Sequence, residues 1–194
     1  DNYIPIYSSG TVTVGPASFT AAVSGTYMYS GAEQTVSYTV TGVDAMVPGN
    51  DYTVTGDKGT AAGDYVLTVT GRGNYSGIQT LDWSIGKVVL TVTADDKTVT
   101  YGDDRPDLTV SYDGFVDGED ETVLGGSLDI GTTYDRWSDV GTYPITVTGY
   151  TSGNYDIEFV DGTVSVNPAT FTIEVSGTYV YSGVEQTVSY TVTG

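Results

Sequence analysis

The sequence predicts an all-β protein built from tandem small modules, each a β-sandwich or an open-barrel-like fold, arranged together as an elongated rod. Three observations support this prediction. A long segment recurs after 152 residues, and apolar and polar residues alternate with the period of a strand. The 26 glycines interrupt stretches rich in Thr, Val and Tyr, which suit a pleated, half-buried surface.

The internal repeat is the strongest of these features. Residues 19–42 read FTAAVSGTYMYSGAEQTVSYTVTG and residues 171–194 read FTIEVSGTYVYSGVEQTVSYTVTG, so only four of the 24 positions differ. Residues 2–16 align with residues 154–168 at the same offset. A fixed period of this kind dictates a repeat architecture, and we therefore expect the chain to be a window on a longer array.

The repeat divides the chain into four segments. We predict the terminal strand of a preceding module over 1–16, a first-type β module over 17–86, a second-type β module over 87–168, and the first half of a repeated first-type module over 169–194. Both complete modules contain a late alternating strand followed by a Gly-Asn-Tyr turn. We infer that they descend from one ancestor.

Alternation also predicts which side chains face the core. In the first-type module one face carries Val36, Tyr38 and Val40, and the last strand points Leu81, Trp83 and Ile85 inward. In the second-type module the inward residues are Tyr143, Ile145, Val147, Val164 and Val166.

Composition excludes several function classes. A formal net charge of −19 disfavours nucleic acid and anionic membrane surfaces as partners, because both need clustered Lys and Arg. The chain has no His and no Cys, which removes the usual general base and most activated nucleophiles. The acidic residues cluster in turn-like segments rather than in an apolar pocket. We therefore predict no enzyme activity, no cofactor and no membrane segment.

The second-type module resembles a known family. Residues 90–120 read LTVTADDKTVTYGDDRPDLTVSYDGFVDGED and residues 138–169 read SDVGTYPITVTGYTSGNYDIEFVDGTVSVNPA. Together they are similar to the MBG-type repeat domain of bacterial cell-surface adhesins. Residues 17–86 resemble the companion repeat seen beside it. The resemblance implies an extracellular, cell-wall-anchored or secreted protein in which these modules form a stalk that projects a binding domain from the cell.

Two ligand hypotheses stand beside the stalk. The acidic turn offers Asp113, Asp117, Glu119 and Asp120 as calcium candidates, because a hard cation takes oxygen ligands from loops. Their spacing differs from that of an EF-hand.

The second hypothesis is that the modules themselves bind a glycan or a host protein. Tyr134, Arg136 and Trp137 lie close together in an irregular stretch and are candidates for an aromatic and cationic patch. The competing interpretation is that these rings cover the end of the module.

Two further expectations concern covalent and intermolecular contacts. Lys87 and Lys97 near the start of the second-type module, with Asn154 and Asn167 near its end, are candidates for an amide cross-link, although lysines solvated at the surface explain them more simply. Unpaired strand edges recruit partners. We therefore expect the ends of the chain to be disordered or to complete each other between neighbouring chains, head to tail.

Overall fold

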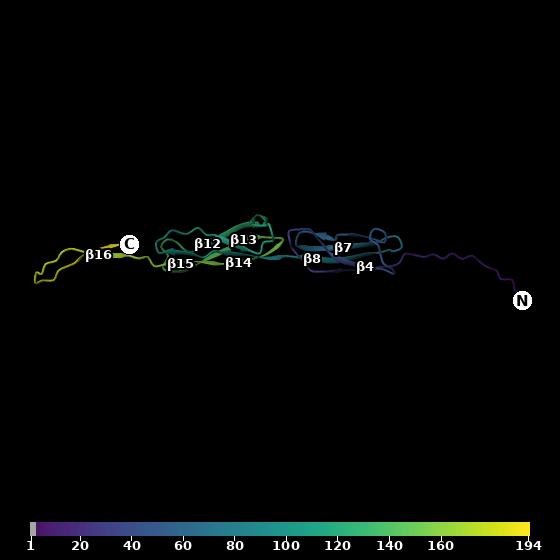
Figure 1. Ribbon diagram of the computed structural model, residues 1–194, viewed down its shortest axis with the longest axis horizontal. Helices are drawn as coiled ribbons and strands as arrows, with labels where there is room; N and C mark the ends of the chain where they lie inside the picture. The colour runs from purple at the N-terminus through teal and green to yellow at the C-terminus, as the bar shows by residue number, and fades with distance from the viewer. Residues whose placement is uncertain (1–2) are drawn as a thin grey trace. The chain divides into compact units, whose positions relative to one another are not determined.

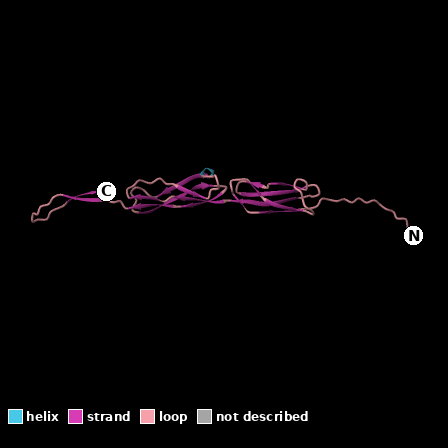
Figure 2. Cartoon of the chain, in the orientation of Figure 1, coloured by secondary structure: helices cyan, strands magenta, loops and turns pink. Residues whose placement is uncertain are grey.

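The computed structural model describes residues 3–194, and strands dominate it (Figure 1, Figure 2). Within this part of the chain the helical structure is the single 3-10 turn η1, Glu121–Val123. The prediction of an all-β fold is therefore confirmed. Residues 3–16 carry no strand, and regular pairing begins with the bridge between Ala17 and Tyr75.

The described residues form two compact units. The first comprises residues 3–88 together with Val116–Glu119 and Gly153–Tyr155. The second comprises Val89–Phe115, Asp120–Ser152 and Asp156–Gly194. The short segments 116–119 and 153–155 thus group with the first unit although they lie far along the sequence. The boundaries predicted at residues 86 and 168 stay predictions.

The first unit contains eight strands in three sheets. They are β1 (Thr20–Ser24), β2 (Tyr27–Met28), β3 (Gln34–Thr35), β4 (Ser37–Thr41), β5 (Tyr52–Thr55), β6 (Lys58–Gly59), β7 (Gly63–Gly71) and β8 (Ile78–Gly86). The largest sheet has the order β2-β8-β7-β5, and β1 pairs with β4 and β3 with β6 in two-stranded sheets. The short β2 runs parallel to β8, whereas β7 and β8 form a long antiparallel hairpin.

Alternation places the core of the first unit where the sequence indicates it. Trp83 and Ile85 of β8 are buried, and Ser84 between them is exposed. Leu67 and Val69 of β7 are fully buried. Tyr38 and Val40 are half-buried and share the inner face of β4, as predicted. One face of each strand is thereby removed from water.

The second unit holds the remaining strands, apart from the first residue of β9 and the first residue of β14. They are β9 (Val88–Ala94), β10 (Lys97–Thr100), β11 (Val110–Asp113), β12 (Gly125–Thr132), β13 (Gly141–Thr151), β14 (Tyr155–Val160), β15 (Gly162–Asn167), β16 (Thr172–Ser176) and β17 (Ser189–Thr193). One sheet has the order β10-β15-β13-β12 and another the order β11-β9-β14. The strands β16 and β17 form a separate hairpin.

Both sheets of the second unit contribute to its core. Leu90 and Val92 of β9 have no exposed surface, and neither do Ile145 of β13 and Val164 of β15. Each such side chain removes enough apolar area from water to contribute about 1.5–3 kcal/mol. The inward residues predicted for β13 and β15 are confirmed, with Tyr143 half-buried at the start of β13.

The two units repeat one topology. The order β2-β8-β7-β5 matches β10-β15-β13-β12: in both, a short strand runs parallel to the last long strand, which is antiparallel to the one before it. The antiparallel pair β1-β4 likewise matches β9-β11. This agreement supports the inference of common ancestry.

The Gly-Asn-Tyr turns serve the same purpose in both modules. The carbonyl of Asn74 accepts the Ala17 N–H at 2.8 Å, and the carbonyl of Asn154 accepts the Val88 N–H at 3.1 Å. The tyrosine that follows each asparagine is buried. Each turn therefore fixes the beginning of its module.

Candidate functional site

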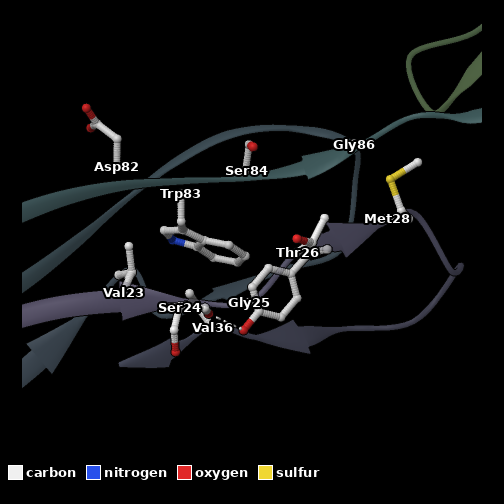
Figure 3. A pocket seen from close by; sticks show the side chains of 11 residues that line it. Val23, Ser24, Gly25, Thr26, Met28, Val36, Asp82, Trp83, Ser84 and Gly86 are labelled. Carbon is white, nitrogen blue, oxygen red and sulfur yellow. Dashed lines mark hydrogen bonds between the residues drawn. The ribbon is translucent and has the colours of Figure 1, made fainter. Parts of the chain in front are cut away.

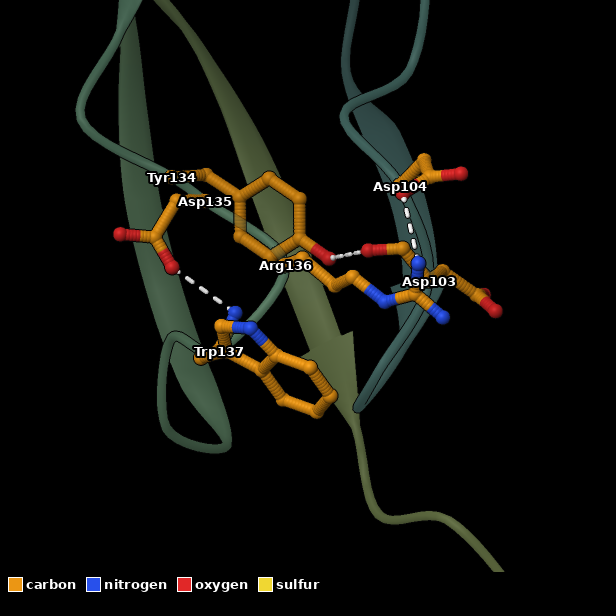
Figure 4. Close-up of polar contacts among 6 residues, drawn as sticks. All are labelled: Asp103, Asp104, Tyr134, Asp135, Arg136 and Trp137. Atoms are coloured by element: carbon orange, nitrogen blue, oxygen red, sulfur yellow. Dashed lines mark hydrogen bonds and ion pairs between the residues drawn. The ribbon is translucent and has the colours of Figure 1, made fainter.

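An exposed aromatic surface lies on the loop between β12 and β13 (Figure 4). The Trp137 side chain is 69% exposed. The guanidinium carbon of Arg136 lies 5.3 Å from the Trp137 ring centroid, and the Tyr101 ring stands edge-on at 6.4 Å. A cation and two rings in this arrangement can stack against a sugar or a flat apolar group.

The loop is held by its first residues. Tyr134 is buried, and its hydroxyl donates to the Asp103 carbonyl at 2.7 Å. Burial, and then the surrounding carboxylates, raise the pKa of Tyr134, so the hydroxyl remains a donor near neutral pH. The Asp135 carboxylate accepts the Trp137 N–H at 2.8 Å. Tyr134 is thus an anchor for the loop, and Trp137 lies at its exposed tip.

The Arg136 side chain forms an ion pair with Asp104. Its Nη1 lies 3.3 Å from Asp104 Oδ1, and both side chains are more than half exposed. Such a pair is worth about 0–1 kcal/mol, so a ligand can displace it easily. The structure therefore brings Arg136 and Trp137 to the surface together. Tyr101, which the sequence reasoning missed, comes from the Tyr-Gly-Asp motif after β10.

The four calcium candidates do not converge. Asp113 ends β11 and is exposed, as is Asp117. Asp120 caps η1 by accepting the Thr122 N–H at 3.0 Å. Across residues 3–194, no group of three or more acidic side chains is placed to hold a metal ion.

Glu119 instead anchors two tyrosines of the first unit. Its Oε1 accepts the Tyr29 hydroxyl at 2.5 Å and its Oε2 accepts the Tyr155 hydroxyl at 2.5 Å. The two rings meet edge to face, with centroids 5.5 Å apart. The Tyr155 oxygen also accepts the Val116 N–H at 3.0 Å. This cluster was not predicted, although the Gly-Asn-Tyr motif marked one of its members.

The two tyrosines that donate hydrogen bonds to Glu119 have raised pKa values. The hydrogen bond to Glu119, followed by burial, raises the pKa of Tyr29. Burial, followed by the hydrogen bond to Glu119, raises the pKa of Tyr155 to about 12. Both hydroxyls therefore stay protonated and keep donating to the carboxylate at neutral pH. The arrangement is a hydrogen-bonded clasp that joins Tyr29 and Tyr155 through the Glu119 carboxylate.

Two of the four cross-link candidates, Lys97 and Asn154, form side-chain hydrogen bonds with other residues. Lys97 Nζ donates to Thr109 Oγ1 at 2.8 Å, and Asn154 Oδ1 accepts the Ala62 N–H at 3.0 Å. These contacts are ordinary hydrogen bonds of exposed or half-buried groups. The proposed amide cross-link stays a prediction.

A hollow lies beside Trp83 (Figure 3). Its volume is about 370 Å³, and Val23, Val36 and Trp83 contribute to its lining. The Trp83 ring is stacked on Tyr65 with centroids 4.7 Å apart, and its Nε1–H donates to the Gly56 carbonyl at 2.9 Å. The interpretation of Trp83 as a core residue is therefore confirmed.

Comparison with known proteins assigns one part of the chain to a family. Residues 90–165 match the family described as MBG domain (YGX type), and this range contains Tyr101-Gly102-Asp103. The match does not include residues 17–86, whose resemblance to a companion repeat stays a prediction. No curated protein and no solved structure matches the chain. Among residues 3–194, no helix has the length and apolar character to cross a membrane.

Proposed function

Because residues 90–165 form an MBG domain of the YGX type, a family of structural repeat modules in bacterial surface proteins, we propose that this chain is a stalk segment of a bacterial adhesin. In this proposal the modules lie outside the cell in an elongated array and hold a separate binding domain away from the surface. Their work is mechanical: they must remain folded when the two ends of the chain are pulled apart.

The observation that carries this proposal is the parallel pairing of an early strand with the last strand of each repeated topology. In the second unit β10 pairs with β15 from Lys97↔Val164 to Thr100↔Asn167. The Tyr101 N–H extends the pair by donating to the Asn167 carbonyl at 2.8 Å. In the first unit β2 runs parallel to the end of β8, and the Tyr29 N–H donates to the Gly86 carbonyl at 2.8 Å.

Parallel pairing determines how a pulling force acts on these hydrogen bonds. Force reaches β10 from its N-terminal side and β15 from its C-terminal side. In parallel neighbours these two directions slide the strands past each other. The bridging hydrogen bonds then share the force and must break together, whereas a pair opened from one end breaks them one by one. Such a unit resists extension more than its modest size indicates.

A pair of substitutions at Tyr101 tests this mechanism. Tyr101→Pro removes the N–H that bonds to Asn167, whereas Tyr101→Ala removes the side chain and keeps the N–H. One lost hydrogen bond is worth about 0.5–1.5 kcal/mol. When single chains are stretched from their ends, we expect Tyr101→Pro to accelerate forced unfolding of the second unit by roughly 2–13-fold and Tyr101→Ala to change it little. Equal effects of the two substitutions would argue against the parallel pair as the element that resists force.

A second function is favoured by the exposed Trp137 and its stacked Arg136. We propose as the alternative that this surface binds a glycan or a host protein. The measurement is retention of the full chain on a glycan array and on immobilised host matrix proteins. The Trp137→Ala variant is compared with the wild type, and Val123→Ala serves as a control at another exposed apolar residue. Specific retention that Trp137→Ala abolishes and Val123→Ala preserves would favour the alternative. Absence of retention by the wild type would remove it.

A further inference from the structure

The strand β1 of the first unit has an equivalent in β9 of the second unit. The Ala17 N–H donates to the Asn74 carbonyl at 2.8 Å, and the Val88 N–H donates to the Asn154 carbonyl at 3.1 Å. Counted from these two contacts, the inward residues of the two strands correspond in order, Phe19, Ala21 and Val23 with Leu90, Val92 and Ala94. The two strands can therefore be compared position by position.

The two strands differ in the number of strands that pair with them. In its sheet β9 lies between β11 and β14, whereas β1 pairs with β4 in a two-stranded sheet. The counterpart of β14 in the first unit is the segment that begins at Tyr75, where a parallel bridge to Ala17 starts a ladder. From Ile78 onward this segment pairs with β7 instead. Within residues 3–194, one edge of β1 is therefore left without a partner strand.

The unpaired edge leaves the second half of β1 incompletely covered. In β9, Val92 and Ala94 are 0% and 2% exposed. The corresponding Ala21 and Val23 of β1 are only half-buried. The strands β4 and β11 do not differ in this way, because their inward residues are half-buried in both units. The missing cover therefore corresponds to the place that β14 occupies beside β9.

The hollow beside Trp83 lies at this uncovered half of β1 (Figure 3). Two consecutive residues of β1 and three of β8 line it: Val23 and Ser24, and Asp82, Trp83 and Ser84. Its volume is about 370 Å³. The hollow is thus bounded by the strand with the free edge and by the strand that pairs elsewhere.

We propose that this edge of β1 binds an extended peptide segment of a partner protein, which adds to the sheet as β14 does beside β9. Strand addition determines the pattern of the segment, because successive side chains of a strand point to opposite faces. In β14 the apolar Tyr155, Ile157 and Phe159 alternate with exposed residues. Apolar side chains at every second position of the bound segment likewise contact Val23 and Trp83.

Charge complementarity makes the segment basic. Asp82 is exposed and lines the hollow, and Asp64 is exposed on the adjacent strand β7, where it lies opposite Ser84. The chain has a formal net charge of −19, so an acidic segment is repelled. Lysine or arginine between the apolar positions pairs with Asp82. A second copy of β1 lacks charged residues and offers no such pairing.

Two peptides test this chemistry. One has the sequence of residues 155–160, Tyr-Asp-Ile-Glu-Phe-Val, and the other has lysine in place of its two acidic residues. In a Trp137→Phe variant of the full chain the remaining tryptophan is Trp83, so its fluorescence reports binding at the hollow. We expect a saturable change with the lysine peptide and at least severalfold weaker binding of the acidic peptide. No binding of the lysine peptide, or equally tight binding of the acidic one, would overturn the proposal.

Charge reversal at the hollow provides the second readout. Asp82→Lys should reverse the preference, so that the acidic peptide binds more tightly than the lysine peptide. Asp44→Lys makes the same change of charge at an exposed position outside the hollow and should keep the original preference. Both replaced side chains are exposed, so urea unfolding should give the two variants similar stability. If both variants shift the preference equally, the peptide responds to net charge alone and the proposal fails.

Backbone methylation distinguishes strand addition from a simple apolar contact. Successive N–H groups of an extended peptide point to opposite edges, so N-methylation of the second and fourth residues blocks one edge and that of the third and fifth blocks the other. We expect one of these two lysine peptides to lose binding and the other to keep it. Equal effects of the two methylation patterns would refute pairing along β1. A dimer of the chain that sedimentation detects and the lysine peptide does not dissociate would assign the edge to a second copy and also overturn the proposal.

Discussion

Replacing Tyr155 by phenylalanine removes a single oxygen from the clasp around Glu119 and leaves the ring in place. That oxygen donates to Glu119 Oε2 at 2.5 Å and accepts the Val116 N–H at 3.0 Å. The side chain is 1% exposed, so water cannot easily replace the lost partner. A hydrogen bond to a charged group is worth about 1.5–3 kcal/mol and a neutral one about 1 kcal/mol. Because Glu119 is half-buried and can rehydrate in part, we expect a loss of about 2–3 kcal/mol.

The Tyr75→Phe variant is a matched control. The Tyr75 oxygen follows the equivalent Gly-Asn turn but accepts only the Asp44 N–H, at 3.2 Å, so its loss should cost about 1 kcal/mol or less. Urea unfolding followed by fluorescence measures both variants. In a Trp137→Phe background the remaining Trp83 reports the first unit, which matters because two units need not unfold in one transition. A cost for Tyr155→Phe no larger than that for Tyr75→Phe would refute the reasoning.

Three other predictions follow from particular contacts. Gly162→Ala would place a Cβ 2.3 Å from the Ala94 carbonyl oxygen, so we expect it to destabilise the second unit by about 1–3 kcal/mol in urea unfolding, and an unchanged midpoint would contradict this. Burial, with the hydrogen bond to Glu119, raises the pKa of Tyr155 from 10.0 to about 12. The contribution of this hydroxyl to the free energy of unfolding is therefore complete below about pH 10 and is lost as the pH rises through about 12. Melting temperatures across this range should fall less steeply for Tyr155→Phe than for the wild type. Lys58→Met breaks the pair with Glu33, in which both side chains are more than half exposed, and it should change the unfolding free energy by less than about 1 kcal/mol, whereas a larger loss in the same assay would show that the pair is not a simple surface contact.

Much of the fold follows from the sequence because burial of one strand face has a period of two residues. That period alone identifies Trp83 and Ile85, and also Val164 and Val166, as inward residues, whatever strands lie beside them. The two-residue period does not determine which strands pair. Lys97 and Val164 are 67 positions apart in sequence and become neighbours only because the chain passes from the sheet that contains β9 to the sheet that contains β10 and β15.

The candidate sites were predicted less completely, for a related reason. The loop that carries Tyr134 and Trp137 is irregular, so no period separates the anchor from the exposed ring. The Glu119 clasp joins groups up to 90 positions apart, and each of its residues has an ordinary local context. By contrast, the repeated hairpin, β1–β4 and β16–β17, was visible in the sequence because identical residues form identical local contacts.

The direction in which the parallel strands are pulled tests the stalk mechanism most directly. Handles at the two chain ends slide β10 along β15, whereas handles attached through cysteines at the opposed Thr98 and Ser165 pull the same strands apart sideways. In single-molecule stretching the mechanism predicts that the second unit unfolds at a severalfold higher force in the first geometry. Equal forces in the two geometries would contradict the claim that these modules are built to carry tension.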